Sequence, residues 1–102
     1  MRILGIDPGI ATVGFGVVDT ERNRQNLVSC GVITTPAGHT LSSRLDRIYD
    51  DLQELIEHFR PDCAAVEELF FTNNITTGIA VAEARGVILL AAKKKQVGIF
   101  EY

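Results

Sequence analysis

Residues 2–9 read Arg-Ile-Leu-Gly-Ile-Asp-Pro-Gly, an apolar strand that ends in one carboxylate and a turn. The run Ile3–Ile6 shows no alternation of polar and apolar residues, which is typical of a strand covered on both faces. Asp is depleted in strands, and a carboxylate at the edge of an apolar core needs a cation or hydrogen-bond donors. The placement of Asp7 therefore indicates the first ligand of a catalytic divalent-metal site.

The remaining pattern predicts the element order β-β-β-α-β-α-β in one α/β domain. Short links between the first three strands favour an antiparallel meander. Apolar residues at three- and four-residue steps predict a helix over residues 41–59 with Thr40 as its N-cap. A second helix, rich in small residues, is expected over residues 78–95. The predicted strands are residues 2–7, 12–19, 26–35, 63–67 and 97–102.

The first helix is a crossover between the first and fourth strands, so these strands should be parallel and joined by a right-handed connection. If they are also neighbours, Asp7 and Glu67 come out side by side at the edge where ligand sites form in open α/β sheets. Two carboxylates held close repel each other unless a cation neutralises them. Mg²⁺ accepts carboxylate oxygens, and two such ions can cleave a phosphodiester, with Asp7 bridging them and Glu67 holding one.

A second interpretation of the same residues needs no metal. Asp7 would then be an Asx-type turn former before Pro8 and Gly9, and Glu67 a charge at a strand end. The spacing alone supports the two interpretations equally. A strand that leads into Asp-x-Gly also opens phosphate-loop enzymes of the actin and sugar-kinase type, so an ATP-binding domain is an alternative from another class.

Size and composition narrow the possible functions. At 102 residues the chain forms one domain at most, and 46% hydrophobic residues indicate a folded core. The net charge of −3 argues against a protein that grips nucleic acid with its whole surface, although a local basic site is compatible with it. With neither a membrane-spanning run nor a leader pattern at its start, the chain is expected in the cytoplasm. Cys30 and Cys63 are expected to be small buried hydrophobes.

Several stretches together resemble the RuvC Holliday-junction resolvases, and the likeness covers the whole chain. The stretches that carry it are Leu-Gly-Ile-Asp-Pro-Gly at 4–9, Gly-Phe-Gly-Val at 14–17, Arg-Pro-Asp at 60–62, Val-Glu-Glu-Leu-Phe at 66–70, Glu-Ala-Arg-Gly-Val at 83–87 and Phe-Glu-Tyr at 100–102. The resemblance implies an RNase H-like fold and a homodimer that depends on Mg²⁺ or Mn²⁺. It also implies paired symmetric nicks in a four-way DNA junction during recombination and repair, and a branch-migration helicase complex as partner.

Carried over by position, the resemblance makes Asp7 and Glu67 the first two of four acidic catalytic residues. Phe70 matches an aromatic implicated in stacking on junction bases, an interaction that contributes about 1–3 kcal/mol per base. Three polar residues after it are candidates for phosphate contacts: Asn73, Asn74 and Thr77. Thr77 is also a candidate N-cap of the second helix. The helix at 78–95 matches a region that helps form the family's dimer.

The chain departs from the family in one large respect. The family's third and fourth acidic residues lie on a C-terminal helix beyond position 102, and Asp46, Asp50 and Asp51 cannot replace them because they are expected on the outer face of the first helix. Residues 1–102 are therefore expected to form a single nuclease domain that is incomplete at its C-terminus. The chain alone should bind Mg²⁺ weakly and cleave no junctions. A third alternative is thus a non-catalytic fragment that dimerises or binds DNA.

Overall fold

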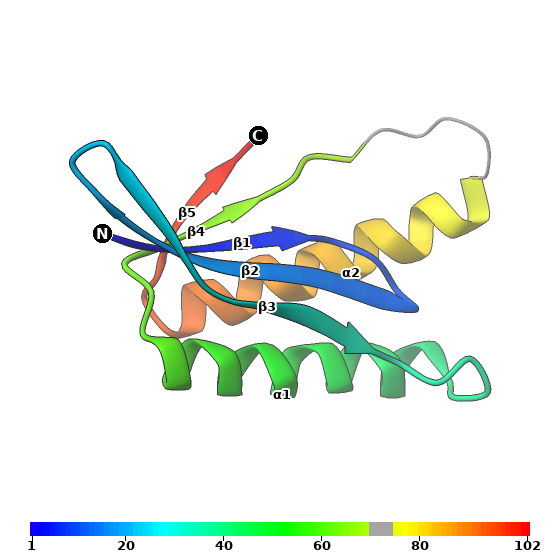
Figure 1. Cartoon of the computed structure of the whole chain (residues 1–102). Helices are drawn as coiled ribbons and strands as arrows, with labels where there is room; N and C mark the ends of the chain where they lie inside the picture. Colours follow the sequence, from blue (N-terminus) through cyan, green and yellow to red (C-terminus); the bar gives the residue numbers. More distant parts are fainter. Residues whose placement is uncertain (70–74) are drawn as a thin grey trace.

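The computed structural model describes residues 1–69 and 75–102, and it confirms the predicted order of elements (Figure 1). Five strands form one mixed sheet in the order β3-β2-β1-β4-β5. The elements are β1 (Arg2–Asp7), β2 (Thr12–Glu21), β3 (Arg24–Thr34), α1 (Leu41–Phe59), β4 (Cys63–Val66), α2 (Ile75–Lys94) and β5 (Gly98–Glu101). The strand that opens the chain is therefore the central one.

The pairing of β1 with its neighbours agrees with the predicted topology. β1 pairs with β2 in antiparallel fashion and with β4 in parallel, and Ile6 lies opposite Val66. The link between β2 and β3 is shorter than predicted, because Glu21 pairs with Arg24 and leaves a two-residue turn. Arg22 in that turn has a positive φ of 54°. The two strands thus extend beyond the predicted bounds into a long hairpin.

One hydrophobic core joins the sheet to both helices. Leu4 and Ile6 of β1 are buried against Ile48 and Leu52 of α1 and Ile88 of α2 within a single cluster. Thr40 caps α1 as predicted, and its side chain accepts a hydrogen bond from the backbone N–H of Ser43. The small residues of α2 that are fully buried in this cluster are Ala84, Ala91 and Ala92. They allow the helix to lie close to the sheet.

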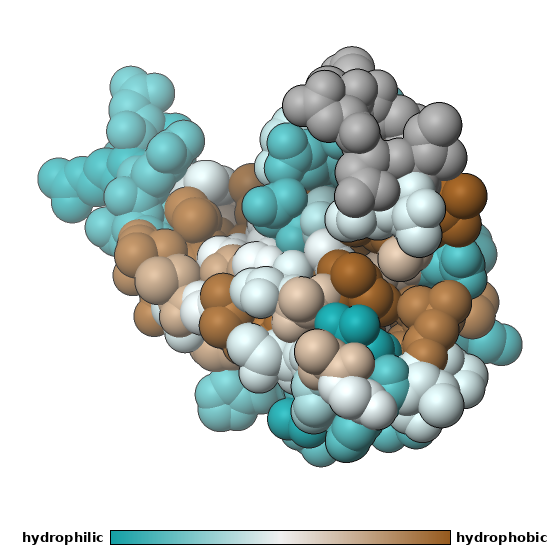
Figure 2. Space-filling view, turned by 90° about the vertical axis from the view of Figure 1, so that its right-hand side faces the viewer, coloured by the Kyte–Doolittle hydropathy of each residue, from teal (hydrophilic) through white to brown (hydrophobic). Residues whose placement is uncertain are grey.

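The opposite face of the β2–β3 hairpin remains exposed. Leu27 and Val32 of β3 are 66% and 58% exposed, and Cys30 lies on the same strand opposite Gly16. The prediction that Cys30 is buried is therefore wrong, because β3 is an edge strand whose outer face carries no helix. Cys63, on an inner strand, is buried as predicted. Figure 2, which views the right-hand side of Figure 1, shows exposed hydrophobic residues as brown patches.

Two further details concern the helices. Arg44, a charged residue of an amphipathic helix, is half-buried, and its Nε donates a 2.8 Å hydrogen bond to the hydroxyl of Thr35. Thr35 is a buried polar residue, and a buried hydroxyl needs partners. Thr77 does not cap α2, because the helix already begins at Ile75. Among the described residues, no helix has the length and apolar character needed to cross a membrane.

Candidate metal centre at the carboxyl edge of the sheet

Asp7 ends the central strand and is exposed at its carboxyl edge. The chain reverses directly after it into β2, through Pro8, which is buried, and Gly9, which is half-buried. A Cβ on Gly9 would lie 2.0 Å from the carbonyl oxygen of Thr12, which no real contact allows, so glycine is needed in this turn. The tight turn ends the strand at Asp7 and leaves its carboxylate at the rim.

Glu67 lies beside Asp7, because β4 runs parallel to β1 in a register that places Val66 opposite Ile6. The backbone N–H of Glu67 donates a 3.1 Å hydrogen bond to the carbonyl of Ile6, one residue before Asp7. Both acidic side chains therefore leave adjacent strands at the same edge. This is the juxtaposition that the crossover connection predicted.

The two carboxyl groups interact directly. The pKa of Glu67 is raised from its usual value of 4.5, first by a hydrogen bond to Asp7, then by the negative charge of Asp7, and last by partial loss of hydration. Such a pair needs a proton or a cation to hold it together.

Gly14 of β2 lies opposite Asp7 in the antiparallel pair. A Cβ at position 14 would come within 3.6 Å of the Asp7 Cβ, whereas a Cβ on Gly16 would meet no atom within 4 Å. A side chain at position 14 would thus contact Asp7 at an ordinary van der Waals distance, whereas one at position 16 would not. Glycine there leaves the flank of Asp7 free of a neighbouring side chain.

Arg85 of α2 contacts the same edge, and the sequence interpretation assigned it no role. Its Nε donates a 3.0 Å hydrogen bond to the backbone carbonyl of Glu67, and its Nη2 donates a 2.5 Å hydrogen bond to Glu101 at the end of β5. The signal available in the sequence was a lone arginine within a helix of small and apolar residues. Such a residue requires acidic or carbonyl partners.

The chemistry of the donor set fits a hard divalent cation, for which Asp7 and Glu67 provide carboxylate oxygens. Within residues 1–69 and 75–102, no group of three or more His, Cys, Asp or Glu side chains is placed to hold a metal ion. Asp46 and Asp50 are exposed on α1, and Asp51 pairs with Arg47 on that helix. They do not join the pair, as predicted.

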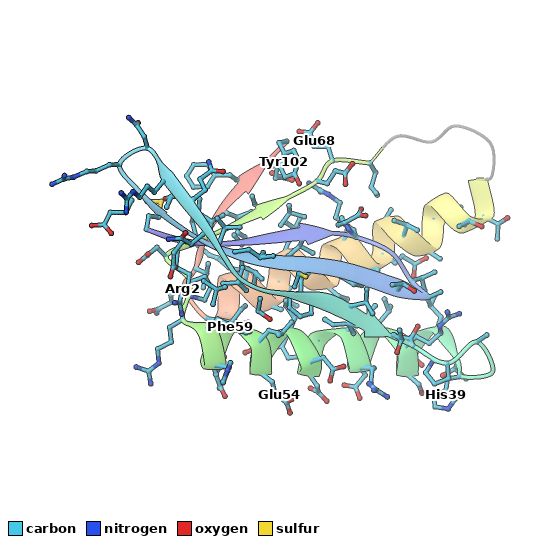
Figure 3. All side chains as sticks on the ribbon, in the orientation of Figure 1. Arg2, His39, Glu54, Phe59, Glu68 and Tyr102 are labelled. Carbon is cyan, nitrogen blue, oxygen red and sulfur yellow. The ribbon has the colours of Figure 1, made fainter. Side chains whose placement is uncertain are left out.

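The candidate DNA-contact residues are described only in part. Phe70, Asn73 and Asn74 lie outside the described residues. Thr77 is exposed in the first turn of α2. Glu68 follows Glu67, and its backbone N–H donates a 2.5 Å hydrogen bond to the carbonyl of Tyr102, beside which it is drawn in Figure 3. Pairing between the fourth and fifth strands thus continues past the last residue of β4.

Comparison with known proteins places these features in one family. A family model described as crossover junction endodeoxyribonuclease RuvC matches residues 3–102. The chain is 55% identical over 100 residues to the RuvC of Rubrobacter xylanophilus, covering 98% of this chain and 56% of that protein. It is 53% identical over 102 residues to the RuvC of Brevibacillus brevis, covering 100% and 61%.

A solved structure agrees with these sequence matches. Thermus thermophilus RuvC in complex with a Holliday junction substrate superposes with a TM-score of 0.90 at 33% identity, over 100% of this chain and 64% of that one. The predicted RNase H-like fold is thereby confirmed. The chain spans less than two thirds of the length of each of these three proteins.

Proposed function

This chain belongs to the RuvC family of crossover junction endodeoxyribonucleases, and on that premise we propose that Asp7 and Glu67 supply two ligands of a divalent-metal site that cleaves four-way DNA junctions. The observation that carries the proposal is the direct contact of these two carboxyl groups at the ends of parallel neighbouring strands. Mg²⁺, or Mn²⁺ in its place, would supply the charge that activates a water and stabilises the leaving oxygen of the phosphodiester.

The residues of this chain have distinct parts in such a site. Asp7 extends from the central strand, which is held by a neighbour on each side, so its carboxylate is the better placed of the two to bridge a pair of ions. Because Asp7 raises the pKa of Glu67, protonation of Glu67 competes with cation binding there, and metal binding should weaken as the pH falls. Gly14 keeps space open beside Asp7 for substrate or ion.

The resemblance implies four acidic residues in the family's site, and this chain supplies two of them, Asp7 and Glu67. The 102-residue chain alone should therefore bind Mg²⁺ weakly and leave junctions uncut. The alternative of a non-catalytic fragment that dimerises or binds DNA is the behaviour we expect from it in isolation. The ATP-binding alternative is not favoured, because the family match covers residues 3–102.

The partners proposed for the whole protein are junction DNA, a second copy of the chain and a branch-migration helicase complex, in the cytoplasm. The Thermus relative was solved with a Holliday junction, which supports the first. A stripe on α2 supports the second. Ile79 and Leu90 are 52% and 49% exposed, and Gly86 lies exposed between them on the same side of the helix.

The test is a junction-nicking assay on a chimera in which this chain replaces the matching part of the Rubrobacter relative. The chimera should nick a labelled four-way junction symmetrically in Mg²⁺ and not in EDTA. Asp7→Asn and Glu67→Gln should each lower the rate by at least about 100-fold, because even residues that only support metal ligands contribute about 10–100-fold.

The matched control is Asp46→Asn, which removes an exposed carboxylate from α1 and should leave nicking unchanged. Undiminished nicking by the Asp7→Asn chimera would overturn the proposal. Robust, Asp7-dependent nicking by the 102-residue chain alone would overturn the claim that its site is incomplete. Binding of labelled ATP in place of junction DNA would instead support the kinase-like alternative.

A further inference from the structure

Glu67 lies just beyond the last residue of β4, and yet its backbone is held on both sides. Its N–H donates to the carbonyl of Ile6 at 3.1 Å, and its carbonyl accepts from the Nε of Arg85 at 3.0 Å. One bond reaches the central strand and the other reaches α2. With both backbone groups occupied, the direction of the Cα–Cβ bond of Glu67 is fixed relative to the sheet.

The guanidinium of Arg85 is itself fixed. Its side chain is 16% exposed, and its Nη2 is paired with Glu101 at 2.5 Å. The planar guanidinium presents its N–H donors in a rigid fork, which suits one carbonyl and one carboxylate at the ends of two neighbouring strands. Because Glu101 neutralises its charge, Arg85 is a poor candidate for binding a DNA phosphate.

We propose that Arg85 is a positioning residue, which holds the backbone carbonyl of Glu67 and thereby directs the Glu67 carboxylate toward Asp7. This inference rests on the proposed metal site and adds a helix residue that prepares it. The bond to the Glu67 carbonyl is the essential one, and the pair with Glu101 orients the guanidinium. Small misplacements of a ligand weaken a site strongly, so the contact matters beyond its contribution to stability.

The contact is tested with the 102-residue chain, with Mn²⁺ as the probe and its affinity measured by electron paramagnetic resonance. Arg85→Ala, which removes both bonds, should weaken Mn²⁺ binding about 10–100-fold, the range for residues that support metal ligands. Glu101→Ala removes the ion pair and leaves the carbonyl contact, so its loss should be smaller. Lys95→Ala is the matched control, because it breaks an ion pair between Lys95, just after α2, and Glu57 of α1, and should leave the affinity unchanged.

A second readout does not depend on the metal. Three-bond couplings of Glu67 in metal-free protein report its χ1 rotamer, which should be single in the wild type and averaged in Arg85→Ala. Arg85→Lys serves if the alanine variant does not fold, since a single ammonium cannot reproduce the fork, and it should also average the rotamer.

The outcomes separate the two claims. An Arg85→Ala chain that folds, binds Mn²⁺ as the wild type does and keeps one Glu67 rotamer would overturn the positioning role. Wild-type protein that binds no Mn²⁺ but shows one rotamer, lost in Arg85→Ala, would overturn the metal site and support the positioning. Averaged couplings in the wild type would overturn the positioning whatever the metal does.

Discussion

The carboxyl groups of Asp7 and Glu67 meet at the carboxyl ends of two parallel neighbouring strands, close enough that Asp7 raises the pKa of Glu67. The turn at Gly9 ends β1 at Asp7. The register of β4 with β1 then places Glu67 beside Asp7 at the same edge of the sheet. The sequence and the geometry therefore agree on two neighbouring carboxyl groups at an exposed edge of the sheet. Proteins retain such pairs where function needs them, and perturbed carboxyls of this kind mark candidate sites.

Asp7→Asn should raise the thermal stability of the metal-free protein at pH 7, because it removes the repulsion between two neighbouring carboxylates. The same variant should lose the stabilisation by Mg²⁺ that the wild type gains, since a ligand stabilises a protein only by binding its folded state. Thermal unfolding with EDTA and with millimolar Mg²⁺ measures both effects. Asp46→Asn should change neither, and a less stable Asp7→Asn protein in EDTA would contradict the repulsion.

Asp19→Asn should remove part of the acid dependence of stability. The hydrogen bond from Arg2, with the charge of Arg2 in support, holds the pKa of Asp19 below its usual 3.8. The contribution of Asp19 is therefore complete above pH 3.8 and is lost as the pH falls through the lowered pKa. Urea unfolding from pH 7 to pH 2 should show a shallower acid decline in Asp19→Asn than in Asp46→Asn.

The Arg2–Asp19 pair also joins three elements, because Arg2 of β1 contacts both Asp19 of β2 and Phe59 of α1. Its Nε and Nη2 donate to the two Asp19 carboxylate oxygens at 2.8 and 3.0 Å, and its Nη1 donates to the carbonyl of Phe59 at 2.8 Å. Figure 3 labels Arg2 and Phe59 near each other at the end of α1. Asp19→Asn should therefore also lower stability at pH 7, and equal stability there would contradict this contact.

Leu52→Ala should destabilise the protein by about 2–5 kcal/mol, because Leu52 is fully buried between α1 and the sheet and its truncation leaves a cavity. Glu54→Ala, on the exposed face of the same helix and labelled in Figure 3, should stay within about 0.5 kcal/mol. Urea denaturation of both variants provides the comparison. A loss below about 1 kcal/mol for Leu52→Ala would contradict the described core.

Gly9→Ala should destabilise the protein by about 1–3 kcal/mol, because its Cβ would lie 2.0 Å from the Thr12 carbonyl oxygen and the turn would have to open. The control is Gly38→Ala in the loop before α1, where an added Cβ meets no atom within 4 Å. Urea unfolding measures stability, and Mn²⁺ affinity reports whether Asp7 has shifted. Equal stability of the two variants would rule out the tight turn.

Local sequence patterns account for most of the secondary structure that could be predicted. The apolar run before Asp7, the three- and four-residue period after Thr40 and the turn residues between strands specify each element through neighbouring residues alone. Element ends were less exact: α2 begins at Ile75, so Thr77 is no cap, and β2 and β3 pair further into their turn than composition suggested. Pairing between strands extends a hairpin even where its residues are polar.

The sequence by itself determined which residues end the first and fourth strands, and therefore that Asp7 and Glu67 are candidates, because strands and turns depend on local side-chain preferences. Only the tertiary structure decided that Ile6 and Val66 are in register, that Cys30 is exposed on an edge strand, and that Arg85 holds the Glu67 carbonyl. Those three relations join residues that are distant in the chain. They depend on how the strands pair and how the two helices pack on the sheet, which no local pattern encodes.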